Sequence, residues 1–156
     1  MLSVSNMSEN LSVEVHSYIK SVIYCRESKQ HQSLIYTIEG SCFKKGLYYE
    51  ELFVYARQLL NKCLIESKEK FNKSLIIAHL DLKGLTMKQI DTNFFKKMIV
   101  MLQSEYEETL EKLIVTNIPV FFKIAYKIVR PFIDRDTKKK IFFEKKNKKG
   151  SLEFTN

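Results

Sequence analysis

The architecture is indicated by one stretch, Leu75-Ile76-Ile77-Ala78-His79-Leu80-Asp81-Leu82-Lys83-Gly84, in which an apolar run ends in a short polar turn. A nearly continuous apolar run of this length is typical of a strand covered on both faces. Gly84 allows the chain to bend, and the Asp81 carboxylate can tie down the turn. Asp81 and Lys83 could also form a catalytic pair, but no set of acid, base and activated nucleophile accompanies them. The favoured interpretation is a strand that ends in a turn.

Apolar patterns on either side of this stretch predict alternating strands and helices. Short apolar runs predict strands at residues 34–38, 75–80, 113–116 and 141–143. Helical spacing of apolar residues predicts a helix over residues 47–66. A capping-box spacing at Thr86 and Gln89 predicts a second helix that runs towards Tyr106. Pro119 is tolerated in the first turn of a helix and opens a third one. Alternation of this kind predicts an α/β sandwich with a largely parallel sheet and crossover helices.

The chain is expected to have three parts. Residues 1–33 form an N-terminal helical or partly ordered segment, residues 34–143 form the α/β domain, and residues 144–156 form a basic polar tail. The helix expected in the first part follows Ser8 and has an apolar face made of Leu11, Val15, Tyr18, Ile19, Val22 and Ile23.

Composition restricts the class of protein. A chain of 156 residues with 45% hydrophobic side chains can bury one core. Its apolar runs are shorter than the roughly 20 residues that cross a bilayer, and residues 1–10 lack the pattern of a secretory signal. Cys25, Cys42 and Cys63 are odd in number and lack a C-x-x-C pair, which favours free thiols, and scattered histidines give no metal-ligand spacing. We therefore expect a soluble, cytoplasmic protein without a metal or cofactor.

Positive charge is concentrated near the C-terminus. The net charge is +8, and residues 138–149 contain seven lysines and one acid, which leaves this segment with 7 − 1 = 6 positive charges. Such a segment is attracted to anionic phospholipid headgroups or to nucleic acid phosphates, although a solvated tail without a partner has the same composition. No recognition helix or aromatic-basic platform accompanies the lysines, so no nucleic acid partner is expected.

Four further segments follow the D-L-K-G turn. In chain order they are Tyr106-Glu107-Glu108, Asn117-Ile118-Pro119, Arg130-Pro131-Phe132-Ile133-Asp134 and Thr137-Lys138-Lys139-Lys140-Ile141-Phe142-Phe143. Together with the turn they resemble the lipid-binding domain of the CRAL-TRIO family, in particular its phosphatidylinositol-transfer branch. The resemblance covers about half of the chain. It implies a CRAL-TRIO-like sandwich in which a mobile gate helix covers a lipid cavity.

The helix after Pro119 corresponds to that gate. One stripe is apolar, and its members are Phe121, Ile124, Ala125, Ile128 and Phe132. Lys123, Lys127 and Arg130 share another side. The resemblance implies that Phe121, Ile124, Ile128 and Phe132 line the acyl-chain space, whereas the basic residues contact membrane. An ordinary core helix with a solvated basic face would have the same pattern. Pro131 is expected to end or kink the helix.

The resemblance also implies a site for the lipid headgroup. The family contacts inositol phosphate through the glutamate of a Tyr-Pro-Glu step and the threonine and lysine of a Thr-x-x-Lys-Ile step, which correspond to Glu108, Thr137 and Lys140. A hydroxyl and an ammonium can donate to phosphate, and a carboxylate can accept from inositol hydroxyls. Glu107 stands where the family has proline. The hydroxyls that bind phosphatidylcholine in the family correspond to residues that cannot hydrogen-bond through their side chains, namely Ile76, Ala78 and Leu102.

These observations predict a non-catalytic, soluble protein that binds or transfers lipid, with phosphatidylinositol as its guest. Its expected partners are phospholipid and, transiently, an anionic membrane surface, which would make it peripheral at membranes. The chain lacks a recognisable N-terminal helical bundle and the family's C-terminal L-P-x-x-x-G-G-like ending. We therefore expect a minimal member of the family, a truncated gene product, or a domain that closes its cavity through self-association. The alternative is a protein-interaction module that kept the CRAL-TRIO fold without a lipid cavity.

Overall fold

The computed structural model describes residues 12–146 and 152–155 of the chain. Its centre is a six-stranded sheet whose strands lie side by side in chain order. The strands from β2 to β5 are parallel, whereas β1 and β6 run antiparallel to their neighbours at the two edges. The strands are β1 Ile23–Ser28, β2 Ser33–Glu39, β3 Ile76–Asp81, β4 Leu110–Thr116, β5 Ile141–Lys146 and β6 Leu152–Thr155. The predicted α/β architecture with a largely parallel sheet is confirmed.

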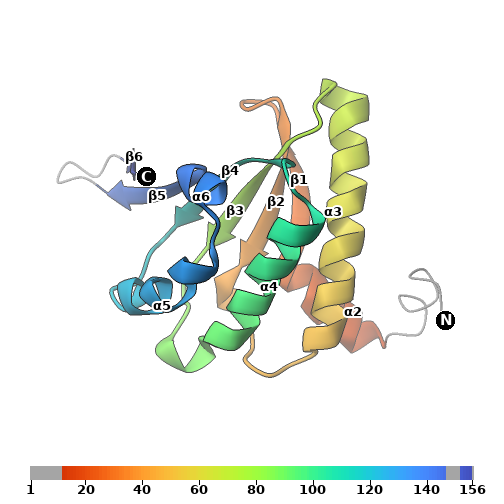
Figure 1. Cartoon of the computed structure of the whole chain (residues 1–156). Coiled ribbons are helices and arrows are strands. Elements are labelled where there is room, and N and C mark those ends of the chain that lie inside the picture. Colours follow the sequence, from red (N-terminus) through yellow and green to blue (C-terminus); the bar gives the residue numbers. More distant parts are fainter. Residues whose placement is uncertain (1–11, 147–151, 156) are drawn as a thin grey trace.

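Helix α2 precedes β1, and the other helices of the described residues connect the strands. They are α2 Val13–Val22, α3 Tyr49–Phe71, α4 Thr92–Glu105, α5 Phe122–Val129 and α6 Arg135–Lys139, with 3₁₀-helices η1 Gly40–Cys42, η2 Met87–Gln89 and η3 Arg130–Phe132. Right-handed crossovers between parallel strands that follow one another in chain order bring the connecting helices to one face of a sheet. Figure 1 shows α3 and α4 in front of the sheet, with α5 and α6 towards its β5 side.

Strands β2 and β3 are buried on both faces where their pairing begins, as the apolar runs predicted. Leu34 and Tyr36 of β2 belong to the core cluster under the helices. Ile35 points to the opposite face, because successive side chains of a strand alternate, and it lies beside Ile77 of β3. Ile35 is 4% exposed and Ile77 is fully buried. The first half of β3 is therefore covered on both sides, whereas Ala78 to Asp81 are half-buried.

Helix α3 is the long crossover between β2 and β3. Its buried residues recur at helical spacing, and they are Leu52, Ala56, Leu60, Cys63 and Ser67. The helix ends at Asn72, whose left-handed backbone (φ 53°) lets its N–H bond the carbonyls of the last turn. Cys63 forms a disulfide with Cys25 of β1. The expectation of free thiols was wrong for this pair, because residues 38 positions apart in the sequence become neighbours only after α3 packs on the sheet.

The first described elements, α2 and β1, lie in the segment expected to be helical. The Ser12 side chain accepts a hydrogen bond from the Val15 N–H and caps α2, so the helix starts later than Ser8. Val15, Ile19 and Val22 are buried, as predicted. Ile23 was placed on the same helix, but it begins β1, which pairs with β2 from Ile23 to Ser28. The many β-branched residues here favour a strand as much as a helix.

The Thr86–Gln89 capping box is present but caps a different element. Thr86 N–H donates to the Gln89 side chain at 2.7 Å, and the motif encloses the 3₁₀-helix η2. Gln89 Nε2 donates to the Phe43 carbonyl at 2.8 Å, which fixes this turn against the rest of the domain. The following α-helix, α4, starts at Thr92 with Asp91 as its cap, where the carboxylate accepts the Phe94 N–H at 3.1 Å. A sequence motif for helix starts does not distinguish the two helix types.

Two core clusters lie beneath the helices. The larger joins buried residues of α2, α3 and α4 to β1, β2 and β3. The smaller lies over β4 and β5, and its buried members are Leu82, Leu85, Val115, Ile133 and Ile141. Phe122 and Tyr126 of α5 pack against it. No helix in residues 12–146 and 152–155 combines the length and the apolarity needed to cross a bilayer.

The C-terminal segment differs from the expected polar tail. Residues 144–146 continue β5, and β6 pairs with β5 from Leu152 to Thr155. The remaining residues of that expected tail, 147–151 and 156, lie outside the described part of the chain.

Candidate functional site

The D-L-K-G turn closes one end of the site region. The Asp81 carboxylate accepts the Lys83 N–H at 2.9 Å and the Asn117 Nδ2 amide at 2.8 Å, which joins the end of β3 to the loop after β4. Gly84 has φ +73°, a conformation that side chains disfavour. Gly40 is needed for a second reason, since a Cβ there would lie 2.8 Å from the Asp81 carbonyl oxygen. Asp81 therefore holds the turn.

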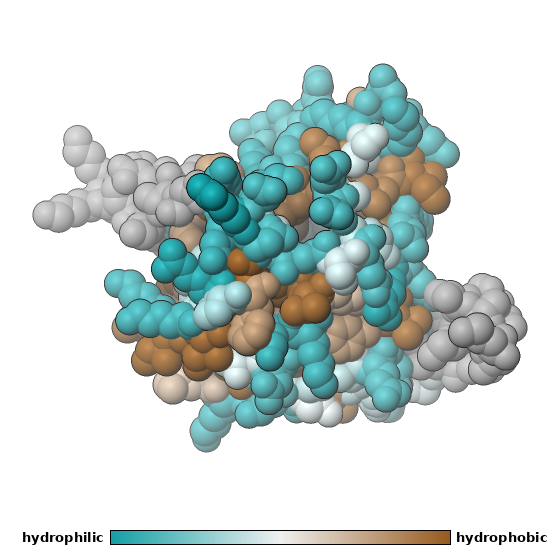
Figure 2. Space-filling view, in the orientation of Figure 1, coloured by the Kyte–Doolittle hydropathy of each residue, from teal (hydrophilic) through white to brown (hydrophobic). Residues whose placement is uncertain are grey.

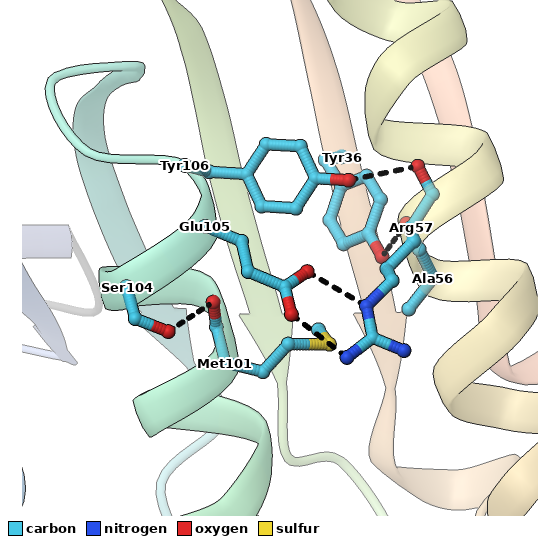
Figure 3. A network of polar contacts seen from close by, with 7 residues as sticks. All are labelled: Tyr36, Ala56, Arg57, Met101, Ser104, Glu105 and Tyr106. Carbon is cyan, nitrogen blue, oxygen red and sulfur yellow. Dashed lines mark hydrogen bonds and ion pairs between the residues drawn. The ribbon is translucent and has the colours of Figure 1, made fainter.

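Figure 3 shows how the Tyr106-Glu107-Glu108 segment is anchored to α3. The Tyr106 hydroxyl donates to the Arg57 carbonyl at 3.2 Å, and the Arg57 guanidinium binds the Glu105 carboxylate through two hydrogen bonds of 2.7 and 2.8 Å. Hydrogen bonding from Arg57 lowers the pKa of Glu105. Behind them the Tyr36 hydroxyl donates to the Ala56 carbonyl at 3.1 Å, so β2 and the end of α4 are both attached to α3.

Glu108 lies in the short connection from α4 to β4. Its backbone is left-handed, with φ 62°. Thr109 accounts for this turn, because its N–H and its hydroxyl both donate to the Tyr106 carbonyl, the hydroxyl at 2.7 Å. The Thr109 carbonyl then accepts the Ile76 N–H at 2.9 Å and begins the pairing of β4 with β3. The Glu108 side chain is exposed at the amino-terminal end of β4.

Thr137 and Lys140 lie on and after α6, at the amino-terminal end of β5. Asp134 caps α6 by accepting the Thr137 N–H at 2.7 Å, and hydrogen bonds from the Thr137 backbone and side chain lower the pKa of Asp134. The Lys140 carbonyl accepts the Leu113 N–H at 2.8 Å, while its side chain is half-buried. Because β4 and β5 are parallel, Glu108 and Lys140 both precede strand starts at the same edge. Within residues 12–146 no hydrogen bond or ion pair joins Glu108 to Thr137 or Lys140.

The apolar stripe expected to line a cavity faces solvent in this structure. Ile124 is 64% exposed, Ile128 is 52% exposed and Phe132 is 41% exposed. Phe121 is half-buried and precedes the first turn of α5. In this structure Ile124, Ile128 and Phe132 therefore do not point into the core, and their role in lining an acyl-chain cavity stays a prediction.

A different pair of residues turns α5 inward. The Phe122 and Tyr126 rings lie 5.7 Å apart, and they lie 5.8 and 5.2 Å from the ring of Phe143 on β5. Both stripes of the helix are apolar, so periodicity alone did not distinguish them. The i, i+4 pair of large aromatic residues was the missed signal, since aromatic side chains bury the most area.

The exposed side of α5 combines apolar and basic residues. Lys123 and Lys127 are exposed beside Ile124 and Ile128, and Val120, just before the helix, is 97% exposed. Figure 2 shows this apolar patch at the lower left, where α5 lies in Figure 1, with hydrophilic residues above it.

Arg130 has a different position from the two lysines. It is exposed, but it lines a pocket between α5, α6 and β5. No group of three or more His, Cys, Asp or Glu side chains in the described residues could hold a metal ion.

Helix α4 holds the segment that follows α5. Gln103 Nε2 donates to the Phe132 carbonyl at 2.8 Å, and the Gln103 Oε1 accepts the Asp134 N–H at 2.7 Å. The Lys96 ammonium lies 3.9 Å from the centre of the Phe132 ring, a cation–π contact. Neither Gln103 nor Lys96 was found from the sequence, because contacts between elements leave no local pattern.

Comparison with known proteins agrees with this geometry. The family model described as "CRAL/TRIO domain" matches residues 16–155. The chain therefore belongs to the CRAL/TRIO family of lipid-binding domains. Its structure is similar to the crystal structure of Sfh5, with a TM-score of 0.69 and 21% sequence identity over 81% of this chain and 50% of that one.

Two curated proteins share part of the sequence. Protein real-time of Drosophila pseudoobscura pseudoobscura and of Drosophila melanogaster are each 32% identical to this chain over 83 residues, half of its length. The matched region is 12% and 13% of those two proteins. The chain thus spans a small part of these relatives and half of the Sfh5 chain.

Proposed function

We propose that this chain is a non-catalytic lipid-binding or lipid-transfer module that takes up phosphatidylinositol at the surface of an anionic membrane. The family supports binding of a lipophilic guest. The observation that carries the proposal is the exposed face of α5, where four large apolar side chains are in water on a short helix: Val120, Ile124, Ile128 and Phe132. Such a cluster is unfavourable in water and marks an interaction surface.

Membrane contact accounts for the composition of this face. A helix with apolar and basic residues on one exposed side can insert its apolar side chains at the acyl boundary while its lysines meet anionic headgroups. Lys123 and Lys127 are placed for that contact. In this proposal α5 is the gate, its apolar face enters the bilayer during lipid exchange, and it lines the acyl chains after closure.

Headgroup recognition is assigned to Glu108, Thr137 and Lys140. The support is their position at one end of the sheet and the half-buried side chain of Lys140, which forms no salt bridge within residues 12–146. The Thr137 hydroxyl is hydrogen-bonded to Asp134, so a headgroup phosphate would share or replace that bond. Losing one charge-assisted hydrogen bond costs about 1.5–3 kcal/mol, which is roughly a 10- to 150-fold loss of affinity.

The test is lipid loading of purified protein, read by native mass spectrometry and by extraction of the co-purified lipid. Lys140→Ala should lose phosphatidylinositol about 10- to 150-fold. Lys97→Ala is the matched control, because Lys97 is an exposed lysine on α4. Equal losses of loading in both variants would mean that Lys140 acts only through the general positive charge of the protein and not through a specific headgroup contact.

The alternative is a protein-interaction module without a lipid cavity. The rings of Phe122, Tyr126 and Phe143 favour it, because they pack α5 directly against β5. The same mass measurement separates the two functions. Co-purified phospholipid supports the first, whereas a folded protein that carries and accepts no lipid supports the second, with self-association through the exposed face of α5 as its simplest form.

A further inference from the structure

A pocket of about 450 Å³ lies between α5, α6 and β5. Four of its described lining residues are cationic and two are aromatic: Tyr126, Arg130, Arg135, Lys138, Lys139 and Phe143. None of these lining residues is acidic. The volume falls in the range of small-molecule sites and exceeds what a single inorganic ion fills.

Helix α6 presents two different sides. Arg135, Lys138 and Lys139 have the i, i+3, i+4 spacing of one helical face, and this face lines the pocket. Thr137 and Lys140 lie on the other side, near Asp134. The pocket therefore shares no residue with the headgroup site assigned to Glu108, Thr137 and Lys140.

The pocket gathers four positively charged side chains. Within the described residues, Arg130, Arg135 and Lys138 form no ion pair. Asp134 and Asp136, which lie at the start of α6, are not among the described lining residues of the pocket. Like charges gathered at one site repel one another, and an anion that enters removes that repulsion.

The side chains suit a phosphate group. Guanidinium groups present a planar fork of donors that matches phosphate oxygens, and lysine adds a point charge. Tyr126 and Phe143 supply an apolar wall, since their rings pack against each other at 5.2 Å. A ring or chain attached to the phosphate would lie on this wall.

We propose that the α5–α6 pocket is a second anion site, which binds the phosphomonoester of a phosphorylated small molecule or lipid headgroup. Tyr126 and Arg130 are spaced i, i+4 at the end of α5, so the pocket lies beside the helix that is proposed to meet the membrane, on a different side from Ile124 and Ile128. Two sources share this chemistry, namely a phosphomonoester lipid in the bilayer and a soluble sugar or inositol phosphate. The proposal does not depend on an enclosed lipid cavity.

The experiment compares two double variants. Arg135→Gln with Lys138→Gln removes two charges from the pocket, and Lys62→Gln with Lys97→Gln removes two exposed charges from α3 and α4. Each is titrated with vesicles of phosphatidylcholine that contain phosphatidic acid or, at matched surface charge, phosphatidylserine. A third arm uses soluble inositol trisphosphate without vesicles.

We expect the pocket variant to lose at least about tenfold in affinity for the phosphomonoester probe, since charge-assisted hydrogen bonds are lost, while the control loses less than about threefold. Binding of inositol trisphosphate alone identifies a soluble ligand, and binding only to phosphatidic acid vesicles identifies a headgroup; both support the site. Equal losses of affinity in the two double variants would overturn the proposal. It would also be overturned if the protein showed no preference for phosphatidic acid over phosphatidylserine and did not bind inositol trisphosphate.

Phosphatidylinositol loading is measured on the same variants. Normal loading with lost phosphomonoester binding separates this pocket from the site at Lys140. Lost loading with retained phosphomonoester binding would instead count against the headgroup site. Arg135 is exposed and Lys138 half-buried, so thermal unfolding should be unchanged and should confirm that both double variants are folded.

Discussion

Replacing Ile124 and Ile128 by alanine should weaken vesicle binding with little effect on stability. Alanine removes three carbons from each side chain, worth about 0.8 kcal/mol per buried CH₂. Insertion into the bilayer can bury only the part of each side chain that is exposed in solution, which is 64% for Ile124 and 52% for Ile128. The expected losses are therefore about 1.5 and about 1.2 kcal/mol, or roughly 100-fold in affinity for the double variant. Alanine also favours helix, so α5 should persist.

The assay is co-sedimentation with vesicles of phosphatidylcholine and phosphatidylserine. The matched control is the double variant Ile65→Ala with Val100→Ala, because these residues are 60% and 44% exposed on α3 and α4. The control should bind as the unchanged protein does. The reasoning is refuted if both double variants lose affinity equally, or if the α5 variant keeps its affinity.

Three further outcomes are expected. Reduction of the Cys25–Cys63 disulfide, or Cys63→Ser, should lower the free energy of unfolding by about 2–4 kcal/mol, as closure of a loop of this length predicts. Cys42→Ser should leave it unchanged, because Cys42 is a free thiol. Equal stabilities of the Cys63→Ser and Cys42→Ser variants in a urea titration would contradict this prediction. Burial lowers the pKa of His79 below its ordinary value of 6.5, so the unfolded chain binds the proton more readily than the folded one. Stability should therefore fall as the pH drops below about 6.5. If His79→Asn shows the same pH dependence, another group is responsible. Phosphatidylcholine should compete poorly with labelled phosphatidylinositol, and displacement at equal concentration would reject the assignment of the three positions that lack hydroxyls, Ile76, Ala78 and Leu102.

The parallel strands could be predicted because their signal is local. The apolar run from Leu75 to Leu80 lies largely in β3 and the one around Val115 lies in β4, because short β-rich runs bounded by turn residues favour strands. The expected helix at 47–66 is contained largely in α3, which ends five residues later at Phe71. Element bounds moved because caps such as Asn72 depend on the whole helix end.

The site could be predicted only in part, since its geometry depends on contacts between elements. The motif around Thr137 placed a headgroup contact just before the strand expected at 141–143, but it predicted neither α6 nor the side of α6 that faces α5. The orientation of α5 depends on whether Phe122 or Ile124 meets Phe143, and both faces are apolar. The Cys25–Cys63 pair and the Gln103 hydrogen bonds join residues far apart in sequence, so no spacing rule identifies them.

The two hydrogen bonds of Gln103 separate a segment that can move, α5, from one that is held in place, α6. One side chain of α4 holds the carbonyl of Phe132 and the N–H of Asp134, which makes this point a fixed anchor between α5 and α6. If α5 moves while both bonds are kept, the backbone must bend at two points. One point is at or before Phe132, in the 3₁₀-helix that contains Pro131, and the other is near Asn117, whose backbone is left-handed. Helix α6 then stays fixed with Arg135, Lys138 and Lys139, whereas a moving α5 carries Tyr126 with it. Movement of α5 would therefore open the pocket along the boundary between a fixed wall and a mobile one.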